Sequence, residues 1–328
     1  MLEEYTTYIK YFNKKVTQTK KEVHKTIIGQ EGTIDYIMRA ILANGHVLLE
    51  GAPGAAKTLL INSFALTVRN AIFKRIQFTP DLLPADVVGL TAYSPEKGFY
   101  TVKGPCFANF LLADEINRAP PKVQSAMLEL MQERQVTIGR KTFQLPKPFL
   151  VLATENPVEQ GGTFPLPEAQ VDRFLFKIIV DYPPKEDEIY LVENNSTVKS
   201  MDEFKIHEVT TPEDLVIMQK MVKKIYLSPA IRQYIVDIIM TTRAQREFPY
   251  KYAKYLAWGS SPRASIALFV GSKAVAFTHN RSYVIPEDVR EVSTGILRHR
   301  MLMNYEGKAS NINPDTMVEE IIRIVPVP

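Results

Sequence analysis

The chain has 328 residues, of which 45% are hydrophobic and 23% are charged. This is the composition of an ordinary globular protein of about two domains, and it excludes a disordered or fibrous chain. The net charge of +4 neither demands a nucleic-acid partner nor excludes a local basic patch. A single cysteine, Cys106, rules out an intrachain disulfide. Since the N-terminal MLEEYTTYIKYFNKK lacks a signal-peptide core and no run of about 18 apolar residues exists, we expect a cytoplasmic protein without a membrane span.

Helical and strand patterns alternate through the first half of the chain. Apolar residues recur at helical spacing over 34–44, a helix expected to be closed by Gly45, and the short apolar run HVLLE follows that glycine. A helix is expected over about 58–68, and another from Pro120–Pro121 to about Arg134, because proline suits the first turn of a helix. Further strands are expected at FKRIQF (73–78), ANFLLADE (108–115), PFLVLATEN (148–156) and RFLFKIIV (173–180). Continuous apolar strands alternating with helices predict an α/β fold, with a parallel sheet covered on both faces.

Two segments do not fit a plain strand–helix unit. The run LTAYSPEKGFYTVKGP has two β-prone stretches around SPEKG, which predicts a hairpin over about 90–104. A second hairpin is predicted over about 135–145, with IGRK at its turn. Both hairpins are expected to project from one end of the sheet.

The character of the sequence changes at Pro183–Pro184. Helix starts follow, each with a capping residue before a proline, at Thr211, Ser228 and Ser261. Another helix is expected from IPEDVREV at 285–292. We therefore divide the chain into an α/β domain at 1–183 and a smaller, mostly helical domain at 184–328.

The loop GAPGAAKT, at 51–58, lies between a buried strand and a helix. It resembles the phosphate-binding pattern G-x-x-x-x-G-K-[ST], except that Ala56 stands where the pattern has glycine. Phosphate binding needs backbone N–H groups around the oxygens and a helix N-terminus aimed at them, and a small helix-forming alanine permits both. Lys57 would add charge at the β- and γ-phosphates, and Thr58 a hydroxyl for Mg²⁺. The alternative is a plain strand-to-helix turn.

Polar residues end two of the later strands. Asp114 and Glu115 close one buried run, where ligands bind in open α/β sheets. Asp114 would hold Mg²⁺ through its water shell, and Glu115 would polarise the attacking water. Asn156 ends the next strand, where its amide could orient that water. An exposed acidic pair and a turn-capping asparagine are the alternatives.

Two arginines could act on phosphate. Arg173 follows LPEAQVD at the predicted start of the last strand, and Arg263 lies in the first turn of the helix opened by SSPRA. A guanidinium offers a fixed fork of donors, and an arginine supplied in trans can accelerate phosphoryl transfer about 10³–10⁵-fold. Surface salt bridges remain the alternative from the residues alone.

Taken together, these blocks resemble the MoxR family of AAA+ ATPases, from about IIGQE (27–31) to the C-terminal helices. The most specific stretches are FTPDLLPADVVG, LLADEINRAPPKVQSAMLELMQERQVTIG, LATENPVEQGGTFPLPEAQVDRF and SSPRAS. The family commonly has alanine at the position of Ala56, so the resemblance implies that the loop binds nucleotide. It also implies a P-loop AAA+ αβα core with a helical lid, and assigns the two hairpins as the helix-2 insert and the hairpin before sensor 1.

The resemblance implies ATP and Mg²⁺ as ligands and gives each site residue a role. Glu115 and Asp114 would form Walker B, Asn156 sensor 1, Arg173 the arginine finger and Arg263 sensor 2. Mg²⁺ would be held near Thr58 and Asp114. The nucleotide would be bound by Gly29, Gln30, Gly51, Ala52, Pro53, Gly54, Ala55, Ala56, Lys57, Thr58 and Leu59.

Family members form rings, usually hexamers, with ATP at each interface, and are thought to remodel or mature partner complexes. They are often encoded beside proteins with von Willebrand factor A domains, so the resemblance implies such a protein as a candidate partner. Two other functions stay open: a nucleotide-gated scaffold with little turnover, and a DNA motor. Lys97, Lys103, Arg140 and Lys141 on the hairpins give only a weak basic signal, so a nucleic-acid partner is not expected.

Overall fold

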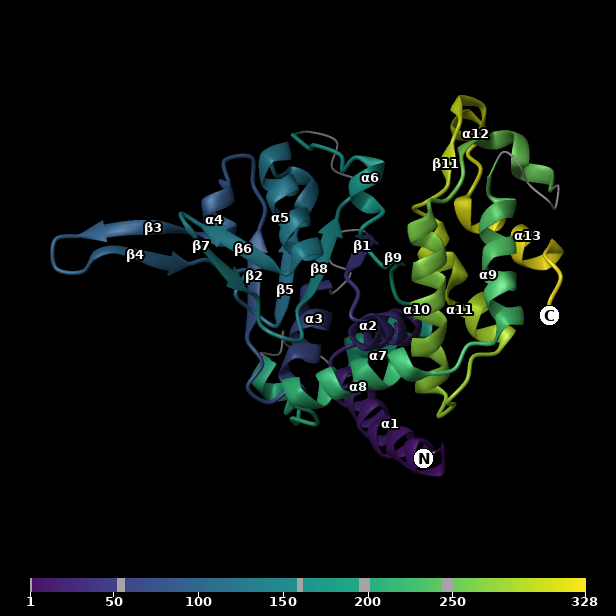
Figure 1. Cartoon of the computed structure of the whole chain (residues 1–328), viewed down its shortest axis with the longest axis horizontal. Helices are drawn as coiled ribbons and strands as arrows, with labels where there is room; N and C mark the ends of the chain where they lie inside the picture. The colour runs from purple at the N-terminus through teal and green to yellow at the C-terminus, as the bar shows by residue number, and fades with distance from the viewer. Residues whose placement is uncertain (1, 52–56, 158–161, 195–200, 244–249) are drawn as a thin grey trace.

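The computed structural model describes residues 2–51, 57–157, 162–194, 201–243 and 250–328. Its centre is a five-stranded parallel sheet (Figure 1). In spatial order, the strands are β2 (Phe73–Gln77), β5 (Phe110–Asp114), β8 (Leu150–Glu155), β1 (Val47–Gly51) and β9 (Phe176–Val180). The predicted α/β fold with a parallel sheet is confirmed.

The three central strands are buried on both faces, as their continuous apolar sequences predict. Alternate residues of β5 show this: Leu112 joins one core cluster, and Leu111 joins the other. On one face pack α2 (Glu31–Ala43) and α3 (Lys57–Leu66), and on the other packs α5 (Pro121–Glu133). The edge strand β2 differs, because Lys74, Arg75 and Gln77 are exposed.

The remaining elements of the first domain are short or peripheral. The long helix α1 (Leu2–His24) packs against α2, α3 and α10. The others are α4 (Pro84–Val88), the 3-10 helix η1 (Ile116–Arg118) and α6 (Glu168–Val171). Both predicted hairpins are present, as β3 (Gly89–Ser94) with β4 (Gly98–Lys103), and β6 (Gln135–Ile138) with β7 (Lys141–Gln144).

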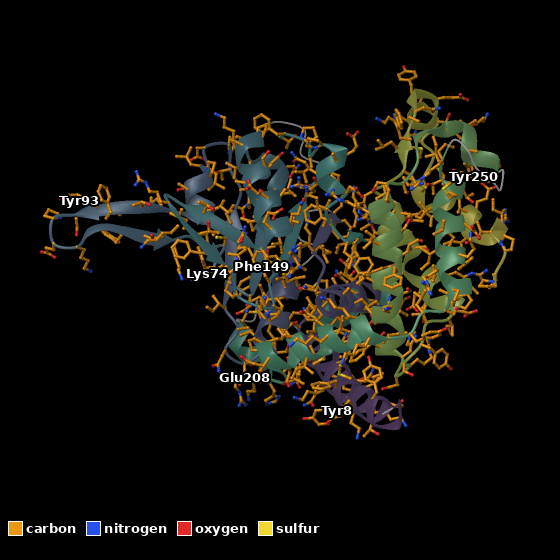
Figure 2. The ribbon with its side chains drawn as sticks, in the orientation of Figure 1. Tyr8, Lys74, Tyr93, Phe149, Glu208 and Tyr250 are labelled. Carbon is orange, nitrogen blue, oxygen red and sulfur yellow. The ribbon has the colours of Figure 1, made fainter. Side chains whose placement is uncertain are left out.

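The β3–β4 hairpin projects far from the body of the protein (Figure 1). Its tip carries Tyr93 and Phe99, which lie opposite each other with ring centroids 5.1 Å apart. These side chains are 65% and 80% exposed, and Figure 2 shows Tyr93 well away from the core. Leu90 and Val102 are exposed on the other face of the same ribbon. A large exposed apolar surface of this kind usually marks a contact with a partner.

After β9 the chain is mainly helical. The elements are α7 (Lys185–Asn194), η2 (Met201–Phe204), α8 (Pro212–Lys224), α9 (Pro229–Thr241), η3 (Lys251–Tyr255), β10 (Leu256–Trp258), α10 (Pro262–Thr278), α11 (Pro286–Leu297), β11 (Leu302–Met303), α12 (Tyr305–Ala309) and α13 (Pro314–Ile324). Side-chain caps form as predicted at Thr211, Ser228 and Ser261. Helix α10 packs against α2 and α11, so the C-terminal helices share a core with one face of the sheet. Within the described ranges, no helix is long and apolar enough to cross a membrane.

Two local predictions were wrong. Arg173 does not begin the last strand, which starts at Phe176; it lies in a turn after α6, because the backbone N–H groups of residues 172–174 bond back to carbonyls of that helical turn. The helix over 34–44 is ended by Asn44 rather than Gly45. Asn44 takes the left-handed conformation and its N–H bonds to Ile41 O.

Candidate nucleotide-binding site

Three strands bring polar groups to the carboxyl edge of the sheet. Strands β1, β5 and β8 run parallel and end there at Gly51, Asp114 and Glu155. Gly51 packs so closely on β9 that an added Cβ would lie 2.3 Å from the carbonyl oxygen of Val180. A side chain at position 51 would therefore push the loop away from the sheet. Ligands of open α/β sheets bind at this edge.

Lys57 is the first residue of α3, and its ammonium group lies over this edge. Its Nζ donates to the carbonyl of Gly51 at 2.6 Å and to that of Glu155 at 3.4 Å. Burial lowers the pKa of Lys57, while the carboxylates of Asp114 and Glu115 act in the opposite direction. Thr58 and Leu59 follow in the same turn. The predicted binding residues Ala52, Pro53, Gly54, Ala55 and Ala56 lie outside the described residues.

Asp114 is a buried carboxylate held from two sides. The hydroxyl of Thr154 on β8 donates to its Oδ1 at 2.6 Å. Arg75 on β2 donates to its Oδ2 through Nη2 at 2.6 Å and Nε at 3.1 Å. Strand pairing places Gln77 beside Asp114, but only Arg75 reaches this acid from the edge strand; the side chain of Gln77 accepts from Arg75 Nη2 at 2.8 Å. The carboxylate is thus fixed in place.

Glu115 has φ = +57°, a left-handed conformation that is rare for a residue with a long side chain. Its N–H donates to Thr154 Oγ1 at 2.8 Å, so one threonine links both acids. Its Oε2 accepts from Gln77 Nε2 at 2.7 Å and from Arg118 Nη1 at 3.1 Å. The backbone turns sharply after β5, and this turn directs the two successive carboxylates differently.

Asn156 is buried directly after β8 and lines a cavity of about 320 Å³. Glu50 and Glu155 line the same cavity from neighbouring strands. Burial raises the pKa of Glu155, and the ammonium of Lys177 opposes that rise. The predicted sensor therefore lies at the carboxyl edge, directly after β8, the strand between β1 and the Asp114 strand β5.

Gly29 and Gln30 precede α2. Gly29 has φ = +70°, and an added Cβ would lie 2.1 Å from the Asp187 carboxylate in the helix that follows β9. Gln30 is the residue before the first turn of α2, and its side-chain oxygen is buried without a hydrogen bond. A side chain at position 29 is excluded by both conformation and space.

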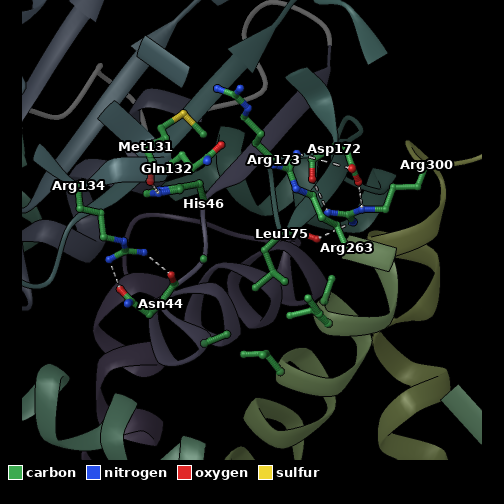
Figure 3. A pocket seen from close by; sticks show the side chains of 15 residues that line it. Asn44, His46, Met131, Gln132, Arg134, Asp172, Arg173, Leu175, Arg263 and Arg300 are labelled. Atoms are coloured by element: carbon green, nitrogen blue, oxygen red, sulfur yellow. Dashed lines mark hydrogen bonds and ion pairs between the residues drawn. The ribbon is translucent and has the colours of Figure 1, made fainter. Parts of the chain in front are cut away.

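The two predicted phosphate-binding arginines lie elsewhere, at the amino edge of the sheet. The N–H of Leu175 bonds to the carbonyl of His46, just before β1, which places Arg173 at the opposite end of the strands from Lys57. Arg173 and Arg263 line one cavity of about 300 Å³ together with Arg134 and Arg300 (Figure 3). In the described part of the chain, Arg173 makes no ion pair, and its Nε is buried without a partner. Arg263 is half-exposed, 3.9 Å from Asp172.

His46 lines this cavity and is buried. Its Nδ1 accepts from the N–H of Val151 at 3.0 Å, so its Nε2–H donates to the carbonyl of Met131 at 3.0 Å. Burial, aided by the charge of Arg134, lowers the pKa of His46 to about 3. The ring is therefore neutral and structural at physiological pH.

The predicted residues therefore form two groups. Lys57, Asp114, Glu115 and Asn156 lie at the carboxyl edge, whereas Arg173 and Arg263 share a cavity at the amino edge. The sequence interpretation missed Arg75, Gln77, Thr154, Asp172 and Arg300. One signal was available for the first two, since polar residues within FKRIQF indicate an edge strand whose side chains remain free to reach a neighbour.

Known proteins resemble this chain over nearly its whole length. Residues 46–176 match the ATPase family associated with various cellular activities (AAA), and residues 252–321 match an AAA lid domain. The chain is 43% identical over 309 residues to Chaperone MoxR1 of Mycobacterium tuberculosis, covering 94% of this chain and 81% of that protein. It is 29% identical to Protein MoxR of Methylorubrum extorquens, covering 94% of each. A crystal structure from Cytophaga hutchinsonii, of a protein assigned as an ATPase, superposes with a TM-score of 0.90 at 44% identity, covering 100% of this chain and 98% of that one.

Proposed function

This chain belongs to the MoxR family of AAA+ ATPases, and we propose that it hydrolyses ATP at the contacts between subunits of a ring. The observation that carries the proposal is the separation of the two groups of site residues. The lysine and the acids lie at one edge of the sheet, and the arginines lie at the other. Strand β1 alone keeps them about 13 Å apart, since its five residues span four rises of about 3.3 Å.

A single chain therefore does not close its arginines over its own Lys57. A head-to-tail contact would place the amino edge of one copy against the carboxyl edge of the next. Such a contact, repeated until it closes, produces a ring with one site at each interface. We propose a hexamer, as the family resemblance implies, with Arg173 and Arg263 acting in trans.

At the carboxyl edge, each residue has a chemical task in this proposal. Lys57 neutralises charge on the β- and γ-phosphates, and the loop of residues 51–56 surrounds them. Glu115 accepts a hydrogen bond from the attacking water, and Asn156 orients that water. Gly29 and Gln30 border the base, and the absence of a side chain at position 29 lets the Asp187 carboxylate pack against this turn.

The carboxyl edge also has the oxygen ligands that Mg²⁺ prefers. Thr58 and Asp114 supply a hydroxyl and a carboxylate oxygen, and Asp114 is already fixed by Thr154 and Arg75. When bound, the ion would neutralise charge on the β- and γ-phosphates. We therefore propose that these two residues hold it.

The partner is proposed to be a protein that the ring remodels. The exposed apolar tip of the β3–β4 hairpin suits a protein surface better than nucleic acid. Of the four basic hairpin residues, Lys103 lies over the rings of Phe107 and Phe143, so three others remain for phosphate contacts, which is a weak basic signal. A client with a von Willebrand factor A domain, in the cytoplasm, is our proposal from the family resemblance.

Turnover across a series of protein concentrations tests this function. We expect ATP hydrolysis per subunit to rise with concentration as interfaces form. In Arg173→Ala we expect a loss of about 10³-fold or more, with nucleotide binding retained, because transition-state charge loses its donor fork. Turnover that ignores both concentration and Arg173 would contradict sites shared between subunits. Tight binding with no turnover in either protein would favour the nucleotide-gated scaffold.

A further inference from the structure

Arg300, just past the end of α11, is a buried arginine with an unusual set of partners. It is only 7% exposed, yet all three of its nitrogens donate hydrogen bonds. The acceptors are Asp172 Oδ1 at 2.7 Å and the carbonyls of Asp172 at 3.0 Å, Phe174 at 2.5 Å, Leu175 at 3.2 Å and Ile296 at 2.5 Å. Four of these five bonds go to the segment 172–175. Arg300 therefore donates hydrogen bonds to the backbone carbonyls on both sides of Arg173.

Two further residues of the lid also contact the segment 172–175. The hydroxyl of Ser261, which caps α10, donates to the second carboxylate oxygen of Asp172 at 2.9 Å. His299 Nε2 lies 3.2 Å from the carbonyl of Phe174. Figure 3 shows Asp172 between Arg300 and the turn that carries Arg173. Lid residues thus fix both neighbours of Arg173.

Arg173 itself has no such support among the described residues. Its side chain makes no ion pair, so its position depends on the backbone beneath it. A guanidinium acting on a neighbour's phosphate has to be placed closely, since a misplacement of about 1 Å can cost about 10²-fold in rate. The backbone of residues 172–175 is the part of the molecule that sets this position.

We propose that Arg300 is a positioning residue for Arg173, and that the lid of one subunit thereby controls the active site of its neighbour. The inference rests on the proposed role of Arg173. Arg300 touches neither nucleotide nor water in this scheme. It holds the turn through a planar fork of donors, which a lysine cannot reproduce with a single ammonium group. Movement of α10 and α11 would move the turn with them.

The test compares Arg300→Lys with Arg298→Lys. Arg298 lies two residues earlier and makes a two-bond ion pair with Asp315 inside the lid, and in the described structure it makes no hydrogen bond to 172–175. For each protein we would measure kcat for ATP hydrolysis, the Kd of fluorescently labelled ADP and the melting temperature. We expect Arg300→Lys to lower kcat about 10²-fold with an unchanged Kd, and Arg298→Lys to keep kcat within about two-fold.

A double variant separates positioning from a general loss of structure. If Arg300 acts through Arg173, Arg173→Ala with Arg300→Lys is no slower than Arg173→Ala alone. Independent, multiplying losses, or wild-type kcat in Arg300→Lys, would overturn the proposal. If Arg300→Lys does not fold, Asp172→Asn replaces it in the same comparison of kcat and Kd. This variant keeps the shape of the side chain at position 172 but weakens its bond to Arg300. Full turnover in Arg173→Ala would instead refute the finger itself, which is a failure of the proposed function.

Discussion

The two edges of the central sheet handle charge in opposite ways. At the carboxyl edge, both acids are held: Thr154 and Arg75 bind Asp114, and Gln77 and Arg118 bind Glu115. At the amino edge, Arg300 is saturated by hydrogen bonds, but Arg173 has no counter-ion among the described residues. The carboxyl edge thus has its acids already fixed in position, whereas the amino edge has a hydrogen-bond donor, Arg173, without an acidic acceptor among the described residues.

This difference suggests how work is shared between copies of the chain. A buried or half-buried guanidinium without a carboxylate partner destabilises the fold unless an anion binds to it. The amino edge has four arginines around one cavity and a single acid, Asp172, which Arg300 and Ser261 already occupy. We take this excess of positive charge as the surface that receives the phosphates bound at the carboxyl edge of a neighbour.

The largest effect expected at the carboxyl edge is that of Glu115→Gln. Loss of the carboxylate removes the acceptor for the proton of the attacking water, so we expect turnover to fall about 10²–10⁴-fold. Nucleotide affinity should remain, because Lys57 and the loop are untouched. Single-turnover hydrolysis and binding of a labelled nucleotide measure the two effects separately. Glu129→Gln, at an exposed position of α5, is the matched control.

Equal losses of binding and turnover in Glu115→Gln would show that this residue supports the turn after β5 rather than the reaction. Its left-handed backbone and its bond to Thr154 do not need the side-chain charge. The isosteric amide should therefore leave the turn intact.

A smaller effect is expected from the neutral histidine of the amino edge. His46 has a pKa of about 3 in the folded protein, below the ordinary value of 6.5. The unfolded chain therefore binds more protons between these values, so His46 makes stability fall as pH drops from about 6.5 toward 3. From pH 7.5 to 5, this corresponds to about 2 kcal/mol, since each full unit below the ordinary pKa contributes about 1.4 kcal/mol.

Urea unfolding of wild type and His46→Gln at pH 7.5 and pH 5.0 measures this contribution. We expect the stability of wild type to decrease more between the two pH values than that of His46→Gln, with His24→Gln behaving as wild type. His299, which is also buried and neutral, remains in every protein compared, so its effect cancels. The same pH dependence in wild type and His46→Gln would show that His46 is solvated or charged in the folded state.

The sequence predicted the elements whose patterns are local. Continuous apolar runs marked the strands, serine and threonine before proline marked helix starts, and SPEKG and IGRK marked turns. Strand order followed no such pattern, since the pairing of β1 with both β8 and β9 depends on contacts far apart in the chain. The side chains that hold the acids and the arginine turn were missed for the same reason.

Arg75 and Arg300 illustrate this limit. Arg75 lies 39 residues before Asp114, and Arg300 lies 128 residues after Asp172. The local sequence indicates at most that Arg75 lies on an edge strand, and it identifies the partner of neither arginine. Arg173 was found by resemblance, but its position in a turn and its distance from Lys57 became visible only when the parallel strands placed their two ends at opposite edges.

Mixing two inactive variants tests the shared site most directly. Lys57→Ala should lose nucleotide binding but keep Arg173, and Arg173→Ala should keep nucleotide but lose the finger. Each alone should hydrolyse almost no ATP. In an equal mixture, about a quarter of head-to-tail interfaces would pair an intact Lys57 with an intact Arg173, so turnover should return to about a quarter of wild type. A mixture that stays as inactive as its components would contradict an active site completed by a neighbouring subunit.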